Sequence, residues 1–195
     1  MMHSTLQGAT PIDPAEARDL IPSHIATQAE LNEWELHNIV EGERWAFGRR
    51  HGKLLTPEFV QRLHWRMFGN TWKWAGDWRR SKKNIGIAPE LIPVRMRELL
   101  DDVTSQIEHR SYPLREIAAR CHHRMVQIHP FPNGNGRLAR TYTDLFLTNH
   151  DESRFTWGDG DLLAIGDARE RYIAALRSAD ARDYGPLMEF LGVKP

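Results

Sequence analysis

The sequence predicts a mostly helical protein, because apolar residues recur at intervals of three and four along several segments. Two of these segments also begin with helix-start signals. Thr27 stands three residues before Glu30, as in a capping box, and Thr56-Pro57 places proline directly after a cap residue. The predicted helices are residues 27–47, 56–68, 93–109, 114–128, 137–149, 166–180 and 187–191.

Length and composition predict one globular domain. The 195 residues suffice for a single core, and the 26 basic and 26 acidic residues balance. This balance gives no electrostatic case for nucleic acid or a membrane as the main partner. A single cysteine excludes an intrachain disulfide, and the sequence shows neither a signal peptide nor an apolar stretch of about 20 residues. We therefore expect a cytoplasmic protein.

The helix predicted for residues 27–47 carries apolar residues on two sides. One side holds Leu36, Ile39, Val40 and Phe47, and the other holds Leu31, Trp34 and Trp45. Glu41 falls on the second side, where a carboxylate beside tryptophans favours a cationic partner. A solvated Glu41, or a local pair with Arg44 or Arg49, is the more common outcome for a glutamate.

The most informative stretch is residues 129–140, His-Pro-Phe-Pro-Asn-Gly-Asn-Gly-Arg-Leu-Ala-Arg. Its glycines allow left-handed backbone, and the N–H groups of a following helix start can bind an anion. Arg137 and Arg140, three residues apart, share one side of that helix and can bind phosphate. His129 precedes this loop and has the side chain best suited to accept a proton near neutral pH. An ordinary Asn-Gly turn is the alternative.

Residues 72–93 show no helical period. They contain three tryptophans and a basic group, Arg79, Arg80, Lys82 and Lys83. The aromatic residues can pack on the core while the basic ones stay solvated, or the set can bind single-stranded nucleic acid. His122 and His123 are adjacent and point to different sides of a helix, which disfavours a transition-metal site with His129.

The stretch 129–140 resembles the signature of the Fic family, H-P-F-x-[D/E]-G-N-G-R-x-x-R, and the chain is most similar to the bacterial subgroup called mobile mystery protein B. The resemblance implies an all-α Fic fold with a small β-hairpin flap. It also implies AMP transfer from ATP to a Ser, Thr or Tyr hydroxyl of a target protein, with His129 as the base. Mg²⁺ or Mn²⁺ would bind at Asn133, where the family usually has a carboxylate. The implied nucleotide-binding residues are Gly134, Asn135, Gly136, Arg137 and Arg140.

Two further segments resemble Fic elements. His37–Gly42 is similar to the inhibitory pattern [S/T]-x-x-x-E-[G/N], with His37 at the hydroxyl position, which implies that Glu41 pairs with Arg140 and restrains activity. Residues 76–79, Gly-Asp-Trp-Arg, match the element before the flap. The flap residues Asn84, Ile85, Gly86 and Ile87 would align a target segment. The implied organisation is an irregular arm, 1–26, and one Fic domain, 27–195, with an inhibitory-type helix at 27–48, the flap at 76–93 and the signature loop and helix at 129–149.

Three functions stay open from the sequence. The first is a protein adenylyltransferase. The second is a nucleotide-binding regulatory or toxin-like module with weak catalysis, which could have an antitoxin chain or a second copy as partner. The third is a Fic enzyme that removes AMP or transfers another phosphate-containing group.

Overall fold

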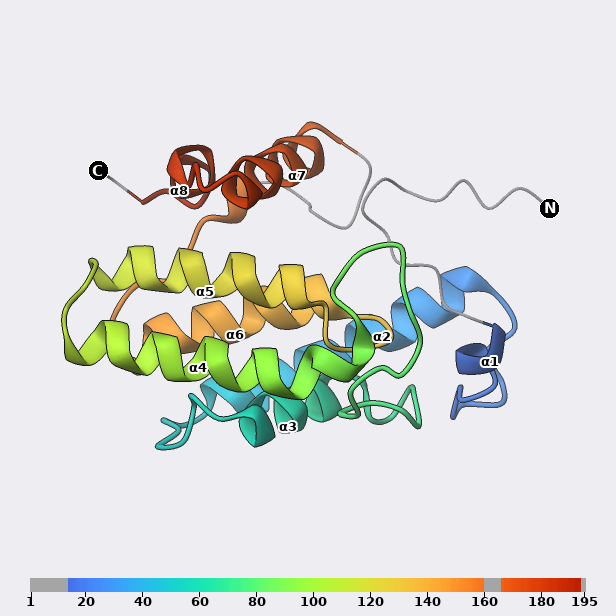
Figure 1. Ribbon diagram of the computed structural model, residues 1–195. Coiled ribbons are helices and arrows are strands. Elements are labelled where there is room, and N and C mark those ends of the chain that lie inside the picture. Colours follow the sequence, from blue (N-terminus) through green and yellow to red (C-terminus); the bar gives the residue numbers. More distant parts are fainter. Residues whose placement is uncertain (1–13, 160–165, 194–195) are drawn as a thin grey trace.

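The computed structural model describes residues 14–159 and 166–193, and its described part is helical, as predicted (Figure 1). Residues 1–13 of the predicted N-terminal arm lie outside these ranges. None of the described helices is both long and apolar enough to cross a bilayer. The elements are α1 (Pro14–Ala17), α2 (Gln28–Phe47), α3 (Pro57–Phe68), η1 (Pro89–Leu91), α4 (Ile92–Glu108), α5 (Leu114–Ile128), α6 (Asn135–Asn149), η2 (Trp157–Asp159), α7 (Asp167–Asp180) and α8 (Gly185–Phe190).

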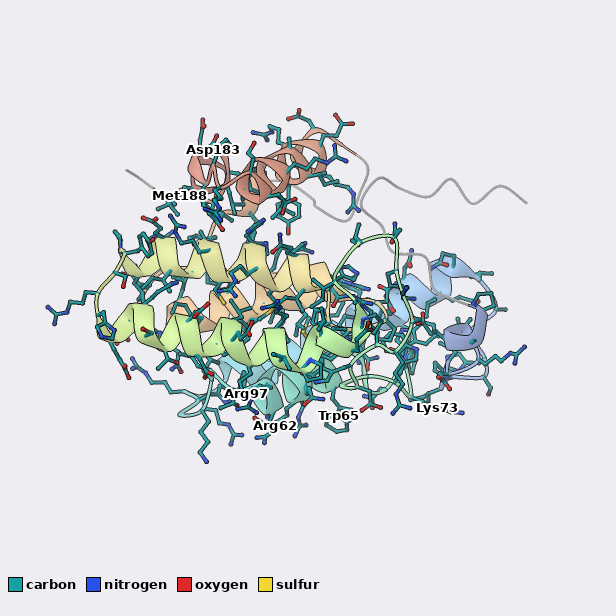
Figure 2. The ribbon with its side chains drawn as sticks, viewed as in Figure 1. Arg62, Trp65, Lys73, Arg97, Asp183 and Met188 are labelled. Atoms are coloured by element: carbon teal, nitrogen blue, oxygen red, sulfur yellow. The ribbon has the colours of Figure 1, made fainter. Side chains whose placement is uncertain are left out.

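Helices α2 to α6 form a bundle, and α7 and α8 form a second layer over α5 (Figure 1). Within the bundle, α2 packs on α3, while α5 packs on both α4 and α6. Side chains fill the space between these helices, whereas Arg62, Trp65 and Arg97 point away from the bundle (Figure 2). The largest fully buried side chains are Leu63, Met67, Phe68, Ile92, Met96, Leu99, Leu100, Ile117, Met125, Phe131, Tyr142 and Phe146.

Helix α2 begins and ends where the sequence predicts, with a capping box between Thr27 and Glu30. Of its two apolar sides, the one that holds Ile39 is only partly buried, because Leu36 and Val40 are 54% and 45% exposed. Gly42 explains this orientation. A Cβ atom there would lie 2.9 Å from the backbone of α3 at Met67, so the two helices meet at the glycine and turn Leu36 and Val40 outward. The buried residues of α2 are Leu31, Glu35, Asn38, Ile39, Gly42 and Ala46.

The β-hairpin flap expected at residues 76–93 is not seen; between residues 76 and 88 the chain is an irregular loop. Arg79 accounts for this. Its guanidinium donates hydrogen bonds to the carbonyls of Ser81 (2.9 Å) and Ile87 (2.6 Å), groups that strand pairing would use. The only β-bridge among the described residues joins Leu20 to Trp72.

The described part of the N-terminal arm is tied to this loop. Glu16, in α1, accepts hydrogen bonds from the Ser81 hydroxyl (2.7 Å) and the Lys83 ammonium, and its carbonyl accepts one from the Trp74 indole (3.3 Å). Part of the basic group is therefore neutralised within the chain, which weakens the nucleic-acid interpretation of residues 72–93.

Candidate active site

His129 ends helix α5 in the left-handed conformation, with φ 54° and ψ 63°. The side chain is buried, and burial lowers its pKa to about 4. The positive charge of Arg79 acts in the same direction, whereas a backbone hydrogen bond with Val126 opposes it. The imidazole is therefore neutral at pH 7, which is the state that can accept a proton.

The backbone of the signature loop between α5 and α6 depends on Gly134 and Asn135. Gly134 has φ 77°, and a Cβ atom there would lie 2.6 Å from the Phe68 ring, so the position requires glycine. The Asn135 side chain accepts a hydrogen bond from the Phe131 N–H and donates one to its carbonyl, both at 2.8 Å. Because α6 begins at Asn135, the N–H groups of its first turn have no acceptor inside the helix.

The two signature arginines both lie near this helix start. Arg137 donates a hydrogen bond to Glu35 (2.7 Å) and stacks over Phe68, with 4.8 Å from guanidinium carbon to ring centroid. Nη1 of Arg140 lies 3.7 Å from the position that a Cβ atom on Gly136 would take, and the guanidinium interacts with the Tyr172 hydroxyl. His129, the glycines and both arginines therefore meet around one loop.

The predicted contact between Glu41 and Arg140 is wrong. Glu41 is exposed, and the ion pair it forms within the described ranges is with His37, at 3.7 Å one turn away. Glu35 is the α2 carboxylate that reaches the site, because it lies on the buried side of the helix. It is 6% exposed, and its second oxygen accepts a 2.7 Å hydrogen bond from the Trp72 indole.

Asn133, the predicted metal ligand, has its amide oxygen directed at two donors. This oxygen accepts hydrogen bonds from the Gly134 N–H (2.6 Å) and the Arg137 guanidinium (3.3 Å). Among the described residues, no group of three or more His, Cys, Asp or Glu side chains could hold a metal ion. A neutral oxygen beside a guanidinium does not fit a divalent cation in this arrangement.

His64 supports the loop, although no sequence motif marks it. It is fully buried, its Nδ1 accepts a hydrogen bond from the Gly76 N–H (3.0 Å), and its Nε2 therefore donates one to the Asn133 carbonyl (3.1 Å). Its ring stacks on Phe131, with centroids 3.7 Å apart. Burial lowers its pKa to about 3, so the ring stays neutral. A histidine next to Leu63 on a buried helix face was the only sequence signal.

Arg79 joins the loop 79–88 to the start of the signature loop. Its Nε donates a 2.6 Å hydrogen bond to the His129 carbonyl, and its N–H donates one to the Pro130 carbonyl (2.9 Å). Of the predicted flap residues, Gly86 lies directly against His129. At φ 98°, a Cβ atom on Gly86 would be 2.6 Å from that of His129. Ile87 bonds to the Ile128 carbonyl, and Ile85 is exposed.

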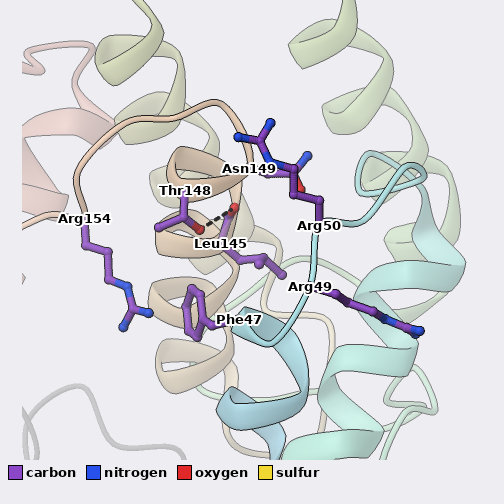
Figure 3. A pocket seen from close by; sticks show the side chains of 7 residues that line it. All are labelled: Phe47, Arg49, Arg50, Leu145, Thr148, Asn149 and Arg154. Atoms are coloured by element: carbon purple, nitrogen blue, oxygen red, sulfur yellow. Dashed lines mark hydrogen bonds between the residues drawn. The ribbon is translucent and has the colours of Figure 1, made fainter.

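A separate cavity of about 280 Å³ lies at the other end of α6 (Figure 3). Because α6 has 15 residues, the cavity is roughly 20 Å from the signature loop. Figure 3 shows Arg49 and Arg154 pointing in different directions, so the guanidinium groups do not converge on one anion. The lining residues are Phe47, Arg49, Arg50, Leu145, Thr148, Asn149 and Arg154.

Comparison with known proteins agrees with this geometry. The model of the Fic/DOC family matches residues 54–147, which include α3, α4, α5, the loop 79–88, the signature loop and most of α6. The fold is that of solved Fic domains. The N-terminal Fic domain of a putative cell filamentation protein from Bartonella quintana superposes with a TM-score of 0.69 at 20% identity, covering 87% of this chain and 84% of that one. Residues 54–147, just under half of the chain, therefore match the Fic/DOC family domain.

A second structure of a Bartonella quintana Fic domain contains bound ADP, with a TM-score of 0.68, 16% identity, and coverage of 87% of this chain and 86% of that one. Among curated proteins, protein adenylyltransferase fic-1 of Caenorhabditis briggsae is 26% identical over 167 residues, which are 80% of this chain and 31% of that protein. The chain spans about a third of the length of the first curated relatives that it matches.

Proposed function

We propose that this protein is an adenylyltransferase that moves AMP from ATP to a hydroxyl side chain of a target protein. The observation that carries the proposal is a buried, neutral imidazole at His129 directly before a glycine-rich helix start with two arginines. Relatives named as protein adenylyltransferases support the same assignment.

In the proposed reaction, the His129 imidazole takes the proton of the target hydroxyl. The hydroxyl oxygen then bonds to the α-phosphorus of ATP, and the bond from that phosphorus to the bridging oxygen of the β-phosphate breaks, so that pyrophosphate leaves. The N–H groups of the loop and first turn bind the phosphates while negative charge develops. Arg137 and Arg140 bind the phosphates that leave.

The Glu35–Arg137 pair restrains this reaction. Nη1 of Arg137 donates to the Glu35 carboxylate and Nη2 to the Asn133 amide oxygen, so the phosphates of ATP have to compete with these acceptors for the guanidinium. The resemblance implied that Glu41 restrains activity, and in this proposal Glu35 has that role instead. Gly86 adds a second restraint, because the loop that holds it lies against His129.

Several finer assignments belong to the same proposal. The target residue is Ser, Thr or Tyr, and Mg²⁺ or Mn²⁺ arrives with ATP, since Asn133 gives a free cation poor ligands. The residues of the signature support membership of the mobile mystery protein B subgroup, for which an antitoxin chain or a second copy would be a partner. The single cysteine supports a reducing compartment such as the bacterial cytoplasm.

A nucleotide-binding module with weak catalysis is the second candidate, because Asn133 replaces the carboxylate of the family pattern. The test is incubation of the wild type and His129→Ala with α-labelled ATP and host lysate, with each metal. His109→Ala, an exposed histidine at the end of α4, is the matched control. Label on protein that disappears only in His129→Ala supports transfer. Bound ATP without label supports the module, and AMP released from a modified protein supports removal.

A further inference from the structure

A chain of buried polar contacts joins Arg140 to two other helices. The Arg140 guanidinium, in α6, lies beside the Tyr172 hydroxyl in α7 and interacts with it, and that hydroxyl lies 2.8 Å from Nε2 of His122 in α5. The other His122 nitrogen, Nδ1, lies 3.4 Å from the Thr143 hydroxyl, back in α6. His122 and Thr143 are almost completely buried, and Tyr172 is also buried.

The direction of every hydrogen bond in this chain follows from the groups present. A guanidinium only donates, so the Tyr172 hydroxyl faces Arg140 with its oxygen, and the Tyr172 proton is left for Nε2 of His122. His122 then carries its own proton on Nδ1, facing Thr143. The Thr143 hydroxyl can accept it, because its own proton goes to the Ala139 carbonyl (2.7 Å).

The chemistry of His122 agrees with this assignment. These hydrogen-bond directions require a neutral His122 ring, and burial lowers the pKa of His122 to about 3. Trp157 lies against the ring, with centroids 4.8 Å apart. The chain of contacts is therefore shielded from solvent, and water does not compete for its hydrogen bonds.

We propose that Tyr172 is a positioning residue for nucleotide binding, which holds the Arg140 guanidinium beside Gly136 so that it meets the β- and γ-phosphates of ATP. This inference rests on the proposed function. It also extends the site beyond residues 54–147, the segment that the family model matches, because α7 supplies the residue that orients a signature arginine.

The test is titration calorimetry of the full chain with ATP and with AMP. Tyr172→Phe keeps the ring but removes the hydroxyl, so we expect ATP to bind about tenfold more weakly. AMP binding should not change, because AMP lacks the phosphates that Arg140 would contact. In an Arg140→Ala background, Tyr172→Phe should have no further effect on ATP.

Tyr142→Phe is the matched control, because Tyr142 is also buried in the bundle and donates a hydrogen bond to the Leu54 carbonyl (3.1 Å). It should lower the melting temperature without changing the ratio of ATP to AMP affinity. If Tyr172→Phe does not fold, His122→Phe, which removes the acceptor of the Tyr172 hydroxyl, should give the same ATP-specific loss.

Equal weakening of ATP and AMP by Tyr172→Phe would overturn the inference, as would an unchanged ATP affinity or an additive loss in the double variant. If the wild type binds ATP and Arg140→Ala weakens it while Tyr172→Phe does not, only this inference fails. If the wild type binds no ATP, the proposed function fails and this inference fails with it.

Discussion

Replacing Glu35 by glutamine removes the negative charge that holds Arg137 and keeps an oxygen for the Trp72 indole. Breaking a fully buried ion pair costs roughly 3–5 kcal/mol, but the cost is smaller here because the Arg137 side chain is 20% exposed. We therefore expect a loss of about 2 kcal/mol in the free energy of unfolding, which corresponds to a fall of roughly 6 °C in melting temperature. ATP no longer competes with the carboxylate, so its affinity should rise about tenfold, or about 1.4 kcal/mol.

The assay combines thermal melting with ATP titration and self-labelling from α-labelled ATP. Glu41→Gln is the matched control on the same helix, and it should change neither stability nor ATP affinity, because Glu41 is exposed and pairs with His37. The reasoning is refuted if Glu41→Gln raises ATP affinity and Glu35→Gln does not. Weaker ATP binding by a folded Glu35→Gln protein would also contradict it.

Gly86→Ala should abolish most transfer activity while ATP affinity stays within about twofold, because a Cβ atom there would collide with His129 and not with the signature loop. Gly52→Ala is the control for both measurements, because a Cβ atom on Gly52 would meet nothing within 4 Å. Asn133→Asp should make ATP binding depend more strongly on Mg²⁺, measured as the ratio of affinities with Mg²⁺ and with EDTA, and an unchanged ratio would count against a cation at this position. Acid should unfold the protein, because buried histidines are neutral when folded but take protons at a pKa near 6.5 when unfolded. Their contribution to stability is complete above about pH 6.5 and is lost as the pH falls toward their folded pKa values, with a slope of about 4 kcal/mol per pH unit near pH 5 for three such groups. Denaturant titrations between pH 4 and pH 7 measure this slope, and a flat profile would contradict the burial argument. The three histidines are His64, His122 and His129.

The helices and the signature loop could be predicted because their signals are local. Caps, periodic apolar residues and the glycines of residues 129–140 each act within a few positions, and the helices begin and end close to where these signals stand. His129 was identified in the same way, because it directly precedes the loop that it serves.

The partners across the bundle could not be predicted, because they join distant positions. Glu35 and Arg137 are 102 residues apart, and nothing near Glu35 in the sequence distinguishes it from an exposed glutamate. The buried side of α2 could not be chosen from the sequence for a related reason. Leu36 and Val40 look like core residues, whereas the true contact face is set by a glycine and by polar residues with partners elsewhere. The expected flap does not form strands because the Arg79 side chain donates hydrogen bonds to two of its carbonyls, which strand pairing would use.

The close approach at Gly42 limits how the site can open. With the α2 backbone seated on that of α3, neither helix can slide or roll past the other without a collision between main chains. Release of Arg137 must therefore come from rotation of side-chain bonds or from tilting of both helices as one body. A larger residue at position 42 would wedge the pair apart and pull the carboxylate away from its arginine without altering either ionic group.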